Sequence, residues 1–172
     1  MTASAPQMSQ GHDPRLEAAH KRLSETGSQA EAFEAIREIV TNLLGCEEMG
    51  IFAPVDGNSK LLWSFGIDTQ RYTSLEGFEK SAMRHVESGE CHIAQVAGED
   101  DSSPSGSLPQ ASIPILLDGR TVAVLVMLRL LPQKVGLDES DLRLVKLLSA
   151  EAGRPLFAQC QRQRFGQARS KG

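Results

Sequence analysis

Residues 111–128 read ASIPILLDGRTVAVLVML, two apolar segments joined by an Asp-Gly pair. Asp118-Gly119 is a strong signal for a two-residue β-hairpin, because both positions of the favoured turn need positive φ angles. The second segment is apolar at nearly every position from Val122 to Leu128. A strand with one solvated face would alternate, so this pattern predicts a central strand that is covered on both faces.

A second hairpin is predicted nearer the N-terminus. Its strands are Met49 to Pro54 and Lys60 to Phe65, and Asp56-Gly57-Asn58 between them suits a tight reversal. Leu61, Trp63 and Phe65 alternate in the second strand, so we expect them to share one face. Cys91 to Val96 predicts one more short strand.

Helical spacing of apolar side chains predicts four helices around these strands. Their expected ranges are 14–23, 29–44, 74–88 and 137–160, and capping boxes at Ser28/Glu31 and Thr73/Glu76 mark two of the starts. Gly153 and Pro155 are predicted to interrupt the last helix. Because each helix buries a single stripe, we expect all of them on one side of the sheet.

The chain divides into four expected parts. Residues 1–12 form a polar, disordered tail, 13–27 an N-terminal helix, 28–160 an α/β domain, and 161–172 a flexible basic tail. The tail from 161 carries Arg162, Arg164, Arg169 and Lys171 and no acidic residue, and a solvated chain end is the simplest interpretation.

Composition favours a cytoplasmic protein that binds neither nucleic acid nor membrane. The formal net charge of -4 gives no basic footprint for nucleic acid. The longest apolar run is much shorter than a membrane span, and the first residues lack the apolar core of a signal peptide. The three cysteines are an odd number with no Cys-x-x-Cys pair, which is typical of reduced thiols.

Several of these segments together resemble the GAF family, over about Glu31 to Phe157. The resemblance rests on LLGC at 43–46, ASIPI at 111–115, DGR at 118–120 and VAVL at 122–125. Ala123 departs from the family, which often has glycine there. The resemblance implies an antiparallel sheet of five or six strands in the order 2-1-5-4-3. The N- and C-terminal helices would pack on one face, and the other face would hold the ligand pocket in members that bind ligands.

Catalytic and cofactor sites within this family find little match in the chain, so we assign no catalytic residue, metal or cofactor. The free methionine sulfoxide reductases are small GAF proteins with pocket cysteines, and they have a Ser-Glu-Ile segment where this chain has PQASIP at 109–114. Cys91 is the best candidate for a reactive thiol, although a packed, reduced cysteine is the more common case. His85 or His92 could be proposed as a haem ligand, but a solvent-facing or core histidine is the simpler interpretation.

Two functions from different classes stay open beside this enzyme alternative. The first is a non-catalytic regulatory module that binds a protein partner and forms a homodimer through Leu16, Leu23, Leu156 and Phe157, on helices that lack an obvious cover. The second is a small-molecule sensor that regulates a separate chain. Residues 97–110 show no helical period, so no helix is expected to roof a pocket, which favours the first. The acidic residues Glu99 to Asp101 match no metal-binding loop.

Overall fold

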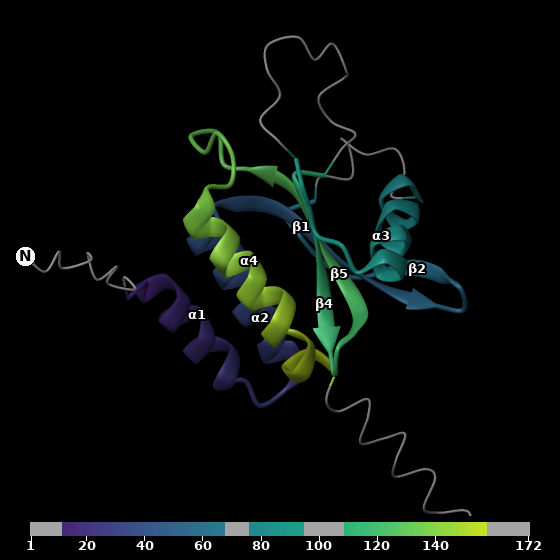
Figure 1. The fold of residues 1–172 in the computed structure, drawn as a ribbon, viewed down its shortest axis with the longest axis horizontal. Coiled ribbons are helices and arrows are strands. Elements are labelled where there is room, and N and C mark those ends of the chain that lie inside the picture. Colours follow the sequence, from purple (N-terminus) through teal and green to yellow (C-terminus); the bar gives the residue numbers. More distant parts are fainter. Residues whose placement is uncertain (1–11, 68–75, 95–108, 158–172) are drawn as a thin grey trace, which may run out of the picture.

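A five-stranded antiparallel sheet in the order β2-β1-β5-β4-β3 forms the centre of the protein, as the resemblance implies. The computed structural model describes residues 12–67, 76–94 and 109–157. Figure 1 shows α1, α2 and α4 against one face of the sheet and α3 against the other. The elements are α1 (Pro14–Ser24), α2 (Gln29–Glu38), η1 (Ile39–Leu43), β1 (Cys46–Val55), β2 (Asn58–Phe65), α3 (Glu76–Ser88), β3 (His92–Ile93), β4 (Ala111–Leu117), β5 (Arg120–Leu130) and α4 (Glu139–Glu151).

The central position predicted for the apolar strand is confirmed. β5 pairs with β1 on one side and with β4 on the other, so it is the third of the five strands. Both hairpin turns have the predicted backbone: φ is 52° at Asp56 and 80° at Gly57, and 51° at Asp118 and 77° at Gly119. Left-handed angles at two consecutive positions match the right-handed twist of the paired strands.

The expected shared face of β2 is wrong, because the strand contains a β-bulge. Ile51 pairs with Trp63 but the next residue, Phe52, pairs with Leu61, so Leu62 has no partner across the ladder. An extra residue reverses the alternation on one side of the bulge. Trp63 therefore packs on Phe33 with the α1, α2 and α4 helices, whereas Leu61 packs toward α3.

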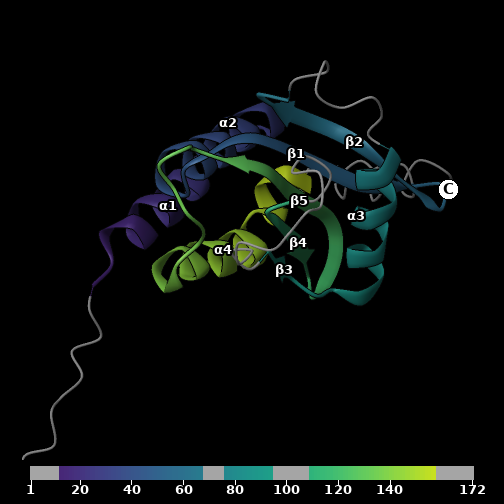
Figure 2. The same cartoon turned by 90° about the horizontal axis from the view of Figure 1, so that it is seen from above.

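The expectation that all helices share one side of the sheet is also wrong. Residues of β5 alternate between two cores: Ala123, Leu125 and Met127 face α1, α2 and α4, and the other set faces α3. The second set is Val124, Val126 and Leu128. A strand that is apolar on both faces needs cover on both, and α3 provides the second cover. Seen from above, α3 lies across the sheet from the other helices (Figure 2).

The first long helix is not α-helical to its end. α2 stops at Glu38 and the chain continues as a π-helix over Ile39–Leu43. The Thr41 hydroxyl donates a hydrogen bond to the carbonyl of Arg37 at 2.7 Å. In a regular α-helix this carbonyl would accept the hydrogen bond of the Thr41 amide. The hydroxyl bond thus lies within the segment where the hydrogen-bond pattern changes.

The last helix is interrupted as predicted. α4 ends at Glu151, and helical geometry resumes over 153–157 after a bend at Ala152. A Cβ at Gly153 would overlap the carbonyl oxygen of Leu116, so glycine permits the close approach to β4. The Ser149 hydroxyl donates to the carbonyl of Pro114 at 2.5 Å. The end of α4 thereby covers the part of β4 beyond its short pairing with β3.

Candidate functional site

The candidate site is the face of the sheet that α3 covers, because two buried hydroxyls without a described partner lie there. Its floor is apolar and closed. Phe52, Val124, Val126 and Leu128 from the strands meet Phe78 and Ala82 from α3, and each is 7 % exposed or less. The space between helix and sheet is therefore occupied by side chains, and the polar groups lie around this packed centre.

Two buried hydroxyls on this face have no hydrogen-bond partner among the described residues. They belong to Ser59 on β2 and Ser112 on β4, which are 4 % and 1 % exposed. Ser112 lies between two residues of the opposite core, so it faces α3, and Ser59 shares a face with Leu61 two positions on. A buried hydroxyl without a partner costs about 1–3 kcal/mol, so both are candidates for contact with something outside the described residues.

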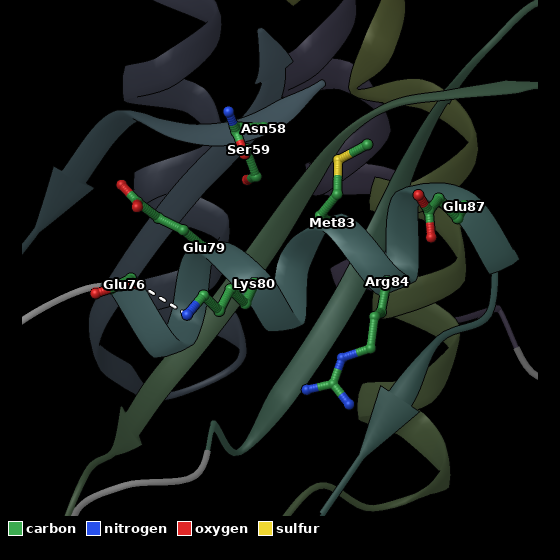
Figure 3. Close-up of a pocket in the computed structure, with 8 residues that line it drawn as sticks. All are labelled: Asn58, Ser59, Glu76, Glu79, Lys80, Met83, Arg84 and Glu87. Atoms are coloured by element: carbon green, nitrogen blue, oxygen red, sulfur yellow. Dashed lines mark ion pairs between the residues drawn. The ribbon is translucent and has the colours of Figure 1, made fainter. Parts of the chain in front are cut away.

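Ser59 lies in a hollow of about 420 Å³ between the start of β2 and α3. Figure 3 shows Glu79 and Met83 projecting from the side of the helix on which Ser59 lies, to the left and to the right of Ser59, while Arg84 projects to the opposite side. Glu76 and Lys80 form an ion pair along the helix at 2.8 Å. The hollow combines a buried hydroxyl, an apolar thioether and a carboxylate on one wall.

A second hollow, of about 580 Å³, lies on the face of the sheet that α1 and α4 cover. It lies between the C-terminal ends of α1 and α4 and the β4–β5 turn. His20 and Glu151 pair at 2.7 Å within it, and both are substantially exposed. None of its described lining side chains is a buried polar group without a partner, so it is a weaker candidate than the hollow at Ser59.

His85 and His92, the two candidate haem ligands, lie close together on the α3 side. Their rings stack with centroids 6.1 Å apart, and His85 Nδ1 lies 3.0 Å from the carbonyl oxygen of Glu90. Across the described ranges no group of three or more His, Cys, Asp or Glu side chains could hold a metal ion. The pair thus gives no metal set from the described residues alone.

The two described cysteines are free thiols far from each other. Cys46 is buried on β1 and packs with the α1, α2 and α4 helices, whereas Cys91 is exposed and precedes β3. β1 and β3 are separated by two strands, which corresponds to roughly 14 Å. Burial raises the pKa of Cys46 to about 11 and also raises the pKa of Cys91. Neither thiol is stabilised as a thiolate, and Cys160 lies outside the described residues.

The four residues predicted at a dimer interface are placed differently from one another. Leu23 and Leu156 are 4 % and 1 % exposed within the single chain. Leu16 and Phe157 are half-buried against the same core. The helices fold back on their own sheet, so the lack of cover that motivated the interface does not exist for Leu23 and Leu156.

A buried ion cluster that the sequence interpretation missed fastens α1 to α4. Asp141 is 1 % exposed and lies 2.7 Å from Arg15 and 2.8 Å from Lys134. Burial by itself would raise the pKa of this carboxyl, but hydrogen bonds from Lys134, Arg15 and the Asp138 amide outweigh it and lower the pKa. Asp138 and Asp141 also form the capping box of α4, whereas Arg15 lies 126 positions from Asp141.

Comparison with known proteins decides the family. The model of the GAF domain matches residues 29–156, which is most of the chain. The chain belongs to the GAF family. No curated protein matches it. α1 and the ion cluster partner Arg15 precede the matched range.

Solved structures with the same fold share little sequence with this GAF domain. The GAF domain of an Acinetobacter phosphoenolpyruvate-protein phosphotransferase has a TM-score of 0.65 at 13% identity, covering 88% of this chain and 96% of that one. The GAF domain of the Escherichia coli potassium sensor histidine kinase KdpD has a TM-score of 0.57 at 14% identity, covering 87% and 96%. A type II free methionine-R-sulfoxide reductase from Thermoplasma acidophilum has a TM-score of 0.52 at 12% identity, covering 84% and 96%. These likenesses establish the fold.

Some sequence-based expectations fall on residues that the structure does not describe. These include the capping residue Thr73, the unroofed segment 97–110 apart from its last two residues, the acidic residues Glu99 to Asp101, and both predicted tails apart from His12. The ends of three predicted elements, at 74–75, 95–96 and 158–160, also lie outside the described residues. Within the described ranges, no helix is long and apolar enough to span a membrane.

Proposed function

We propose that this GAF domain is a non-catalytic regulatory module that acts by associating with protein partners, as a homodimer. The observation that carries the proposal is the packing between α3 and the sheet. The family resemblance implies that ligands bind on this face, and here Phe52 and Phe78 occupy the space with exposed fractions of 0% and 7%. A centre filled by apolar side chains leaves a small molecule little room, which favours association.

The state of the thiols supports a role other than catalysis. A reductase-like mechanism needs an attacking thiolate with a resolving thiol nearby. Burial raises the pKa of both Cys46 and Cys91, and their strands are separated by two others. Free, unpaired cysteines also support our proposal of a cytoplasmic location, where thiols stay reduced.

The outer edge of the sheet at β2 offers a surface for association. β2 is an edge strand, and its backbone groups on the outer side pair with no described strand. Leu62 and Phe65 are 39% and 37% exposed there, and the Arg37 guanidinium lies 5.3 Å from the Phe65 ring centroid. Exposed apolar side chains beside an open edge are typical of a surface that a partner covers.

The experiment for the homodimer is sedimentation velocity on the full chain at micromolar concentration. We propose that Leu16 and Phe157, the half-buried members of the predicted set, contribute to the interface. Leu16→Gln and Phe157→Gln should weaken the dimer about tenfold, while Val135→Gln, at an 82% exposed position on a loop, should leave it unchanged. A wild-type protein that sediments as a monomer would contradict the proposal.

The second candidate function is a small-molecule sensor that regulates another chain. The unpartnered hydroxyls of Ser59 and Ser112 favour it, because a polar ligand could satisfy either group. Mass analysis of small molecules released when the purified protein is denatured tests it. A single compound released in stoichiometric amount favours the sensor, and its absence favours the association module.

A further inference from the structure

The hollow between β2 and α3 differs from an ordinary surface groove because a buried polar atom lies at its floor. The Ser59 side chain is 4 % exposed, and its hydroxyl has no hydrogen-bond partner among the described residues. Burying such a group without a partner is unfavourable unless something else satisfies it. The hydroxyl can donate one hydrogen bond and accept two, so it suits a polar ligand.

The charges around this hydroxyl favour a cationic ligand. Glu79 is half-buried and lines the same hollow, on the side of α3 where Ser59 lies (Figure 3), and it forms no ion pair with any residue that the structure describes. The other glutamate at the start of the helix, Glu76, holds Lys80 at 2.8 Å. Arg84 extends to the opposite side of α3 (Figure 3). The side of the hollow that contains Ser59 therefore presents an uncompensated carboxylate.

The remaining walls set the kind of cation. Met83 contributes an apolar thioether to the lining, and Asn58 contributes an amide. A thioether wall contacts methylene groups well, while the carboxylate and hydroxyl receive N–H donors. The volume of about 420 Å³ is large enough for a short aliphatic chain that ends in a charged group.

We propose that this hollow binds an alkylammonium or guanidinium group. Glu79 is its counter-ion, the Ser59 hydroxyl oxygen accepts one of its N–H bonds, and Met83 packs on the adjoining methylenes. This inference goes beyond the proposed function and does not depend on it, since the hollow lies outside the packed centre formed by Phe52 and Phe78. The same head group occurs on free amines and on lysine or arginine side chains of a peptide.

The test is a titration of the isotope-labelled full chain, followed by NMR, with agmatine and with glutarate as an anion of similar length. Agmatine should shift the amides of β2 and α3, and glutarate should not. Glu79→Gln should weaken agmatine binding about tenfold or more, and Ser59→Ala about threefold, as expected for hydrogen bonds to a charged group. Glu139→Gln, an exposed glutamate in the first turn of α4, is the matched control and should change nothing.

A blocked peptide, acetyl-Gly-Arg-Gly-amide, distinguishes the two sources of the cation. Equal or tighter binding than agmatine assigns the site to a basic segment of a partner, and weaker binding assigns it to a free amine. Either result supports the site if Glu79→Gln weakens the binding about tenfold or more. Equal losses in Glu79→Gln and Glu139→Gln would overturn the proposal, because they would show only general charge attraction.

Thermal unfolding separates a binding role of Ser59 from a structural one. If the hydroxyl lacks a partner in the free protein, Ser59→Ala should keep or raise the melting temperature while reducing the stabilisation by agmatine. A lower melting temperature for Ser59→Ala, with unchanged agmatine affinity, would show that the hydroxyl has a structural partner. That result would overturn the assignment of Ser59 to the site.

Discussion

The two faces of the sheet differ in whether their buried polar side chains have partners. On the face covered by α1, α2 and α4, the buried carboxylate of Asp141 forms ion pairs with Arg15 and Lys134 and accepts a hydrogen bond from the Asp138 amide. On the face covered by α3, the hydroxyls of Ser59 and Ser112 have no partner among the described residues. The first face is built for stability, whereas the second retains unsatisfied groups at some cost in stability.

The difference indicates where function can vary in this fold. Three helices and their closing ion cluster hold one side of the sheet in place, so substitutions there should mainly change the free energy of unfolding. Among the described helices, α3 alone covers the other side, and the hollow and the histidine pair lie beside it. Substitutions beside this helix should mainly change binding.

The largest expected effect is at the centre of the sheet, where both faces are closed. Val124 is 0 % exposed on β5 and faces α3. Val124→Asp should lower the free energy of unfolding by about 4 kcal/mol or more, because it buries an unpaired carboxylate. Urea unfolding measures this, with Val135→Asp as the exposed control. If Val124→Asp keeps wild-type stability, α3 does not close its face.

The next effect compares glycines on the two sides. Gly153→Ala should destabilise by about 2–3 kcal/mol, because its Cβ would overlap the Leu116 carbonyl oxygen and α4 would have to move from β4. Gly77 on α3 has open space around its Cβ position, so Gly77→Ala should stabilise by about 0.5–1 kcal/mol. A lower melting temperature for Gly153→Ala and a higher one for Gly77→Ala would support this difference between the two faces. Equal changes in the two variants would contradict it.

An effect of similar size that also depends on pH is expected at Asp141. Asp141→Asn removes the counter-charge of Arg15 and Lys134 and should cost about 2–3 kcal/mol at pH 7, less than a fully buried pair because both cations are partly exposed. Folding lowers the pKa of this carboxyl below its ordinary value of 3.8. The charged carboxylate therefore stabilises the fold at pH values above 3.8, and this stabilisation is lost as the pH falls through the pKa of the folded state. Wild type and variant should therefore converge in acid below about pH 4. A difference that is constant from pH 7 to pH 2 would contradict this.

The smallest expected effects separate the serines of the two faces. Ser149→Ala should cost about 1 kcal/mol, since it removes the hydrogen bond to the Pro114 carbonyl. Ser59→Ala and Ser112→Ala should be neutral or stabilising by up to about 1 kcal/mol, because neither hydroxyl has a described partner to lose. Urea unfolding of the three variants measures these changes. If Ser112→Ala lowers the free energy of unfolding as much as Ser149→Ala, the two faces do not differ in this respect.

Local signals in the sequence were sufficient for the strands, the turns and the family fold. Asp118-Gly119 and the apolar run from Val122 predicted the central hairpin, because turn angles and alternation depend on neighbouring residues. The side of α3 was missed because an apolar stripe shows that a helix packs, but not on which face of a sheet. The bulge at Leu62 depends on the register of two strands.

The candidate site was less accessible from the sequence. Cys91, His85 and His92 stood out by their chemistry. The structure places the two histidines together and Cys91 exposed before β3, without a metal set among the described residues. Ser59 carried no signal, because its importance lies in the absence of a partner, which only the folded chain reveals. The Arg15–Asp141 pair likewise depends on a contact between distant residues.

Native mass spectrometry of the full chain, purified without added ligand, tests the central claim most directly. An association module whose α3-side centre is already packed should appear as a ligand-free species at twice the chain mass of 18.6 kDa. A monomer that retains a small molecule in stoichiometric amount would contradict the claim and assign the chain to the ligand-sensing members of its family.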